Sequence, residues 1–249
     1  MEFFALTIFP GMFDAFAGHG IIRRAAQSGR IRITPVNIRD YAEGRHKVTD
    51  DRPYGGGSGM VMKPEPLAAA IRDIRGRRPD AKTVLLSPQG RRFDQETARR
   101  YAGEDFLIFV CGRYEGIDER ICETYIDDEI SIGDYVLSGG ELAAMVVIDA
   151  VTRHVPGALG AEDSAEYDSF SDSRLEHDHY TRPRVFEGKE VPGVLLSGDH
   201  RAVEDWRRES ALLRTLLRRP DLLEKKGLTD REKRIVKKWC RYLESLATD

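Results

Sequence analysis

Residues 131–141 read Ser-Ile-Gly-Asp-Tyr-Val-Leu-Ser-Gly-Gly-Glu, a loop with three glycines between a strand-like run and an apolar helix-like run. Two shorter loops of this kind lie upstream, Ser-Pro-Gln-Gly at 87–90 and Gly-Arg-Tyr-Glu-Gly at 112–116. Glycine lets backbone N–H and C=O groups approach a ligand with no Cβ in the way, and ligands of open α/β sheets bind beyond the carboxyl ends of strands. One such loop is typical of an ordinary turn, but three after successive strands predict a ligand site.

The runs around these loops predict an α/β fold. Strand-like and helix-like segments alternate over the first 155 residues, which is typical of a mainly parallel sheet with helices on both faces. The expected strands span 3–9, 31–38, 83–86, 106–110 and 126–132. The expected helices span 66–75, 94–102, 117–125 and 141–153, and Asp94 is the expected N-cap of the second.

The alternation stops near Gly160, which divides the chain. We predict a ligand-binding domain over 1–160, a flexible acidic linker over 161–173 and a small helical C-terminal domain over 174–249. The expected helices of that domain span 201–217, 220–226 and 230–246. Thr229 and Glu232 have the spacing of a capping box for the last helix.

Composition and charge narrow the class of protein. With 249 residues, 41% of them hydrophobic, the chain can bury a core, and no apolar run reaches the ~18 residues of a membrane span. Three cysteines and an N-terminus without a basic leader predict a reduced, cytoplasmic protein. The net charge is −3, but residues 201–245 hold fourteen Lys or Arg against eight Asp or Glu. That excess is compatible with a phosphate-binding surface and with a merely solvated helical one.

The absence of several sequence motifs excludes common classes of active site. No Gly-x-Gly-x-x-Gly follows the first strand, and there is no Walker A sequence, zinc-binding His-Glu-x-x-His or Gly-x-Ser-x-Gly elbow. The glycine-rich segment 54–60 is interpreted as a mobile lid or a simple flexible loop. His177-Asp178-His179 is interpreted as an exposed polar turn rather than a metal site, and no metal ligand is predicted.

Segments 86–90, 111–118 and 131–141 resemble the three signature loops of the bacterial tRNA (guanine-37-N1)-methyltransferases, of the knotted (SPOUT-type) superfamily. Segments 7–13, 54–60, 179–183 and 218–222 are similar too, so the resemblance covers nearly the whole chain in order. It implies a trefoil knot in the C-terminal part of the N-terminal domain, with S-adenosylmethionine bound by the knot loops. It also implies a homodimer with active sites at the subunit interface, and magnesium dependence without an identified ligand.

The resemblance implies a role for individual residues as well. The methyl acceptor is nitrogen 1 of guanine 37 in tRNA when guanine also occupies position 36. Asp168 is the expected general base for the proton on that nitrogen, and Arg153 is expected to stabilise charge on the guanine oxygen. The positions carried over for the cofactor are Leu86, Ser87, Pro88, Gly112, Tyr114, Glu115, Ile132, Gly133, Asp134, Tyr135, Val136, Leu137, Gly139 and Gly140.

Other interpretations remain open from the residues alone. Asp168 by itself is compatible with a solvated acid, and Arg153 with a helix C-cap. A related knotted methyltransferase could act on another RNA nucleotide, and an RNA-binding module without activity could keep the same fold. The intact glycine loops together with Asp168 and Arg153 favour the methyltransferase over both. A nucleotide-dependent dehydrogenase is disfavoured because its phosphate fingerprint is missing.

Overall fold

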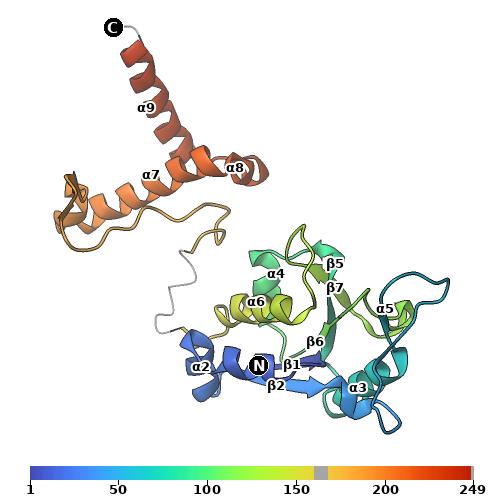
Figure 1. The fold of residues 1–249 in the computed structure, drawn as a ribbon. Coiled ribbons are helices and arrows are strands. Elements are labelled where there is room, and N and C mark those ends of the chain that lie inside the picture. The colour runs from blue at the N-terminus through green and yellow to red at the C-terminus, as the bar shows by residue number, and fades with distance from the viewer. Residues whose placement is uncertain (160–167, 248–249) are drawn as a thin grey trace. The chain divides into compact units, whose positions relative to one another are not determined.

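The structure, a computed structural model, describes residues 1–159 and 168–247. The chain divides into two compact units, Met1–Glu162 and Asp163–Asp249, coloured from blue to red along the chain in Figure 1. Residues 161–167 of the predicted acidic linker lie outside the described residues, and residues 168–173 form turns and bends.

A five-stranded sheet forms the centre of the first unit, in the order β2-β1-β6-β5-β7, and all its pairs are parallel. Its strands are β1 (Glu2–Thr7), β2 (Arg32–Asn37), β5 (Lys82–Arg92), β6 (Phe106–Cys111) and β7 (Asp128–Ser131). A separate two-stranded sheet pairs β3 (Asp50–Asp51) with β4 (Val61–Met62). The mainly parallel sheet predicted from the sequence is therefore confirmed, although β5 continues six residues past its predicted end.

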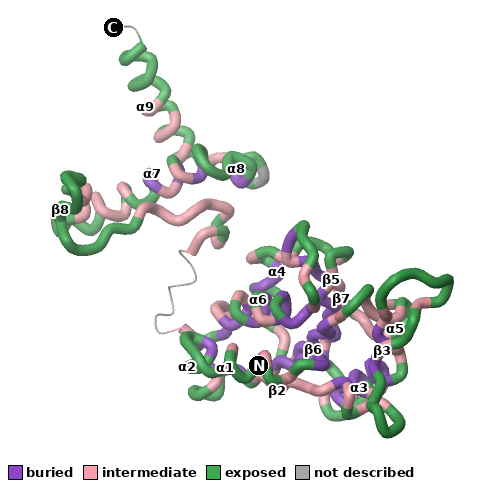
Figure 2. The backbone as a smooth tube through the Cα atoms, viewed as in Figure 1, coloured by how far each residue is buried: buried purple, intermediate pink, exposed green. Residues whose placement is uncertain are grey.

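Both faces of this sheet are covered, which explains why β6 and the centre of β1 are apolar without interruption. Successive residues of β1 point to opposite faces, so Phe3 joins one buried cluster and Phe4 the other. The first cluster includes residues of α1 (Gly11–Ala17), α2 (Gly20–Gln27), α4 (Gln95–Ala102) and α6 (Glu141–Thr152). The second includes residues of α3 (Pro64–Arg77), α5 (Glu119–Tyr125) and the 3-10 helix η1 (Ile38–Tyr41). Figure 2 shows the buried backbone concentrated in these strands and helices.

The ends of the helices can be compared with the capping residues predicted from the sequence. Asp94 caps α4 as predicted, because its carboxylate accepts a hydrogen bond from the Thr97 N–H at 2.9 Å. Helices α1 and α2 were not predicted from the sequence. They have seven and eight residues.

The second unit is mainly helical. It contains α7 (His200–Arg218), α8 (Pro220–Lys226), α9 (Asp230–Ala247), the 3-10 helix η3 (Gly193–Leu196) and a small hairpin of β8 (Val185–Phe186) and β9 (Lys189–Glu190). The predicted capping box is confirmed, since the Thr229 N–H and hydroxyl donate to Glu232 at 2.7 and 2.8 Å. Within residues 1–159 and 168–247, no helix is long and apolar enough to cross a membrane.

An ion-pair cluster at Asp128 fastens the edge strand β7 to its neighbours. The side chain of Asp128 is 12% exposed and accepts hydrogen bonds from Arg91 at 2.6 Å, Tyr101 at 2.7 Å and Arg100 at 3.0 Å. Burial works to raise the pKa of this carboxyl, but the three donors outweigh burial and lower the pKa to about 2. The charged form therefore stabilises the fold.

Replacing Asp128 with Asn should lower the free energy of unfolding by about 2 kcal/mol at neutral pH. Because the folded-state pKa is depressed, this contribution is present above about pH 4 and is lost as the pH falls toward 2. The difference between Asp128→Asn and the original chain should shrink over that interval. Urea unfolding followed by circular dichroism measures it, with the exposed Asp80→Asn as the control of equal charge change. A difference that is constant from pH 6 to pH 2 would contradict the assignment.

Candidate functional site

The loop of β5 is a break inside the strand. Pairing between β5 and β7 shifts register between Leu86 and Arg91, so residues 87–90 bulge out of the sheet. A Cβ on Gly90 would lie 2.4 Å from the backbone nitrogen of Ile130, which only glycine avoids. The bulge displaces these residues from the ladder and exposes them at the end of the neighbouring strand.

The loop after β6 is held by backbone contacts on both sides. The Glu115 N–H donates to the Met60 carbonyl oxygen at 3.0 Å, and the Met62 N–H donates to the Gly116 carbonyl oxygen at 2.9 Å. Tyr114 has a φ of 60°, a left-handed conformation that a residue with a Cβ adopts only where its surroundings enforce it. The end of the glycine-rich segment 54–60 is therefore a structural support of this loop.

The loop after β7 runs from Ile132 to Gly140 and ends against the loop after β6. The Gly140 N–H donates to the Gly112 carbonyl oxygen at 2.9 Å. A Cβ on Gly140 would lie 2.8 Å from the Cα of Cys111, so the two backbones approach more closely than any other residue permits.

These three loops enclose one cavity of about 440 Å³ at the carboxyl ends of β5, β6 and β7. Among the described residues, all of the predicted cofactor positions line it except Asp134. They are Leu86, Ser87, Pro88, Gly112, Tyr114, Glu115, Ile132, Gly133, Tyr135, Val136, Leu137, Gly139 and Gly140. The prediction that the three loops meet at one edge of the sheet therefore gives the right place for the cavity. The order of the strands differs from their order in the chain, since β5 lies between β6 and β7.

Sequence reasoning predicted Glu115 at the cavity but missed two further carboxylates. Glu119 and Glu129 line it together with Glu115, and Arg113 is the single Lys or Arg among the described lining residues. Arg113 is neutralised by Glu141, to which its Nε donates at 3.0 Å. The cavity therefore has an excess of negative charge, which favours a cationic ligand.

The Arg113–Glu141 pair joins a partly buried arginine to a buried glutamate and belongs to a larger network. Glu141, the first residue of α6, is completely buried and also accepts a hydrogen bond from the Thr7 hydroxyl at 2.7 Å. Arg113 donates to the Ser138 carbonyl oxygen at 3.2 Å and lies over the Phe9 ring at 4.5 Å. From the sequence, a glutamate at the first position of a helix is explained by its favourable interaction with the helix dipole, and nothing in the sequence indicates that its side chain is buried.

The two predicted catalytic residues lie in different units. Arg153 is the C-cap residue of α6 in the first unit, where its N–H donates to the Asp149 carbonyl oxygen at 3.3 Å. Asp168 begins the described part of the second unit, and its carbonyl oxygen accepts from the Ser171 N–H at 3.1 Å. The structure thus brings the cofactor positions together within one unit and places Asp168 in the other.

Asp168 lines a second cavity, of about 730 Å³, which lies entirely within the second unit. This cavity has a mixed lining of cations, acids and imidazoles, with Arg207, Arg208, Arg231, Glu176, His177 and His179 among the residues around it. Arg174 anchors the segment next to Asp168, since its guanidinium donates to Glu232 at 2.8 Å and to the Gly227 carbonyl oxygen at 2.8 Å. The predicted general base therefore lies in a hollow built on α7 and α9.

Comparison with known proteins identifies the family of the chain. The family model described as tRNA (Guanine-1)-methyltransferase TrmD matches residues 1–225. The chain belongs to this family. It is 61% identical over 246 residues to a protein of Desulfatibacillum aliphaticivorans, covering 99% of this chain and 94% of that protein. It is 56% identical over 245 residues to a protein of Syntrophotalea carbinolica, covering 98% and 99%. Both relatives are named tRNA (guanine-N(1)-)-methyltransferase, and the family predicted from the three loops is confirmed.

The close approach of the two loops predicts different effects of an alanine at two glycines. Gly140→Ala should lower the free energy of unfolding by about 1–3 kcal/mol, because the new Cβ meets backbone that cannot move aside. Gly112→Ala is the matched control, since its Cβ would make an ordinary contact of 3.6 Å with Ile117. Thermal unfolding of both variants measures the difference. Equal midpoints would show that the loops separate without cost.

Proposed function

We propose that this chain is a cytoplasmic methyltransferase that acts on nitrogen 1 of guanine 37 in tRNA, where guanine 36 precedes it. The proposed methyl donor is S-adenosylmethionine. The observation that carries the proposal is the convergence of three glycine loops on one cavity in a chain of this family. The names of the relatives specify guanine N1 and tRNA, which supports the acceptor atom and the substrate class.

The chemistry of the cavity fits the proposed donor. Leu86, Ile132 and Leu137 offer apolar surface for an adenine ring, and the backbone groups of the loops are available for its edge. The carboxylates of Glu115, Glu119 and Glu129 suit a ligand with a positive sulfur and an ammonium group. When bound, S-adenosylmethionine would supply a methyl group on a sulfonium sulfur that leaves as a neutral thioether.

Asp168 is the proposed general base. Nitrogen 1 of guanine carries a proton and becomes nucleophilic only as that proton leaves, and a carboxylate within hydrogen-bond reach can accept it. Such assistance contributes typically ~10²–10⁴ in rate. An ordinary aspartate is a weak base, so the negative charge on the guanine oxygen also needs stabilisation. Arg153 is proposed to supply it as a fixed cation.

The decisive experiment is methyl transfer to tRNA transcripts with a labelled donor. A transcript with guanine at positions 36 and 37 should accept one methyl group, and replacement of guanine 37 should abolish transfer. Transfer to the replaced transcript would show that this family member acts on another nucleotide.

Asp168→Asn should remove turnover and leave donor affinity nearly unchanged, because asparagine keeps the shape but accepts no proton. Asp172→Asn is the matched control, since Asp172 belongs to the same segment and its side chain is 79% exposed. Single-turnover methylation should fall ~10²-fold or more in the first variant and stay near the original rate in the second. A near-normal rate for Asp168→Asn would refute the general-base role.

The second unit is the proposed tRNA-binding domain, because residues 174–249 hold 18 Lys or Arg against 14 Asp or Glu while the whole chain has a net charge of −3. We propose further that the chain acts as a homodimer and that the loops after β6 and β7 belong to a trefoil knot. The hydrogen bond between Gly140 and Gly112 shows that these two loops lie side by side, as the proposed knot requires. Sedimentation of the purified chain tests the dimer.

The basic ends of the helices provide a test of tRNA binding. Arg219 is paired with Asp221 at 2.7 Å, so part of its charge is already engaged. Arg218→Ala should therefore weaken tRNA binding and reduce the slope of log affinity against log salt concentration by about one. Arg219→Ala should have a smaller effect on both. Filter binding between 50 and 200 mM salt measures both slopes. Unchanged slopes in both variants would mean that these arginines only solvate the surface.

Among residues 1–159 and 168–247, no cluster of ligands fits the magnesium dependence that the family resemblance implies. In the described parts of the chain, one cluster of three His, Cys, Asp or Glu side chains converges, namely Glu176, His177 and His179. Magnesium prefers oxygen ligands, and two of these three ligands are imidazoles. No step is therefore assigned to magnesium.

A further inference from the structure

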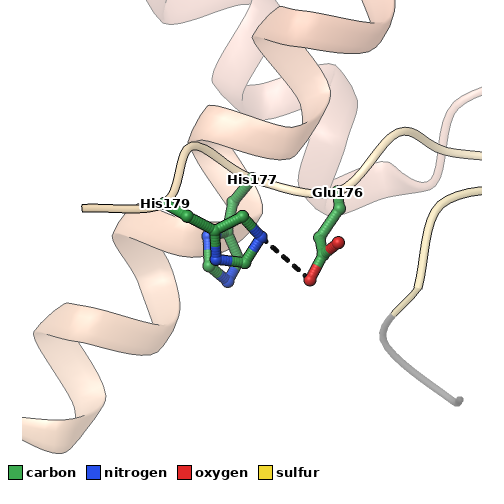
Figure 3. Close-up of side chains that lie close together, drawn as sticks. All are labelled: Glu176, His177 and His179. Atoms are coloured by element: carbon green, nitrogen blue, oxygen red, sulfur yellow. Dashed lines mark ion pairs between the residues drawn. The ribbon is translucent and has the colours of Figure 1, made fainter. Parts of the chain in front are cut away.

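Glu176, His177 and His179 converge in the segment that runs along α7. One ligand atom from each lies within 4.8 Å of the others. The His179 Nε2 is 3.0 Å from the Glu176 Oε1, and the two imidazole centroids are 4.5 Å apart. Figure 3 shows the three side chains on the same side of the backbone, with the His179 ring turned toward the carboxylate.

The surroundings orient these groups before any ligand binds. The His177 Nδ1 lies 2.9 Å from the Asp178 carbonyl oxygen, and because a carbonyl oxygen can only accept, Nδ1 carries the proton. The lone pair of His177 is therefore on Nε2. A hydrogen bond from the second ring nitrogen to a carbonyl is how metal-binding histidines are commonly held.

The neighbouring backbone is fixed as well. The Glu176 N–H donates to the Ser169 hydroxyl at 3.0 Å, and the Asp178 N–H donates to the Ser210 hydroxyl at 3.0 Å. The Asp178 carboxylate is turned away from the cluster because it is bound by Arg214 and accepts from Ser210 at 3.1 Å. Glu176, and not the Asp178 between the two histidines, is thus the acidic member of the cluster.

We propose that Glu176, His177 and His179 form a binding site for a divalent transition-metal ion of the zinc class. Two imidazoles and one carboxylate are a ligand set that suits zinc and excludes a preference for magnesium or calcium. A metal with bonds of about 2.0–2.1 Å fits between atoms 3.0 Å apart. It would bind the His179 Nε2 in place of the proton that this nitrogen donates to Glu176, and the neutral ring would then carry its single proton on Nδ1.

The cavity gives the ion access and an open coordination position. All three ligands line the 730 Å³ cavity, and the His179 side chain is 64% exposed. Repulsion between the metal ion and the nearby arginines is reduced, because Arg208 is paired with Glu204 at 2.9 Å and Arg231 is paired with Asp205. Through the hydrogen bond from Glu176 to Ser169, the ion would also restrain the residue next to Asp168.

The first test is isothermal titration of the chelator-treated full chain with zinc chloride, in a Cys240→Ser background that removes the exposed thiol. One ion should bind per chain, and His177→Ala, His179→Ala and Glu176→Gln should each weaken binding at least ~10-fold. His200→Ala is the matched control, since His200 is an exposed histidine of the same unit and should bind zinc like the original chain. Circular dichroism checks that each variant is folded.

The second test uses Trp206, whose ring lies 6.2 Å from that of His177. Nickel ions bound at the cluster should quench its fluorescence in a Trp239→Phe chain, and millimolar magnesium should neither quench it nor compete. Absent zinc binding, or binding and quenching that persist in all three ligand variants, would overturn the proposal. Neither test involves tRNA or the methyl donor, so their failure would not bear on the proposed function.

Discussion

The contact between Gly140 and the backbone at Cys111 and Gly112 is the constraint on which the first unit depends. It joins the end of the loop after β7 to the start of the loop after β6, with no space for a side chain between them. Helix α6 begins at the next residue, so the contact also fixes where α6 starts over the sheet. The buried Glu141 then requires partners, because an unpaired buried carboxylate costs several kcal/mol. Arg113 and Thr7 supply them from the loop after β6 and from the end of β1.

These contacts also fix part of the cavity wall. Two of its walls, the loops after β6 and β7, cannot move independently, since the Gly140 N–H donates to the Gly112 carbonyl oxygen and the Glu115 N–H donates to the Met60 carbonyl oxygen. The backbone groups of these two loops are therefore held at fixed positions beside three carboxylates of the lining. Such preorganisation reduces the entropy lost when a ligand binds. The negative charge of the lining and the apolar surface of the loops together favour a partly apolar cation, and the proposed methyl donor has a positive sulfur and an apolar adenine face.

In the second unit, side-chain hydroxyl groups hold the extended segment from Asp168 to His179. The segment from Asp168 to His179 has no sheet partner, so its backbone N–H groups need acceptors elsewhere. Hydroxyl groups of α7 supply two of them, with Thr215 accepting from Leu175 and Ser210 accepting from Asp178. These bonds keep the segment extended along the helix and hold Glu176, His177 and His179 on one side. The proposed general base and the proposed metal site consequently share one short piece of chain.

The sequence by itself determined the parallel sheet, the helix caps at Asp94 and Thr229, and the three loops that line the cavity, because these depend on local periodicity, capping chemistry and glycine. It determined the family too, because the order of the loop residues is distinctive. Only the tertiary structure decided that β7 pairs with β5, that Glu141 is buried against Arg113, and that Glu176 rather than Asp178 joins the two histidines. Each of these is a contact between residues whose partners are chosen by packing and by the direction of the backbone, which neighbouring positions in the sequence do not encode.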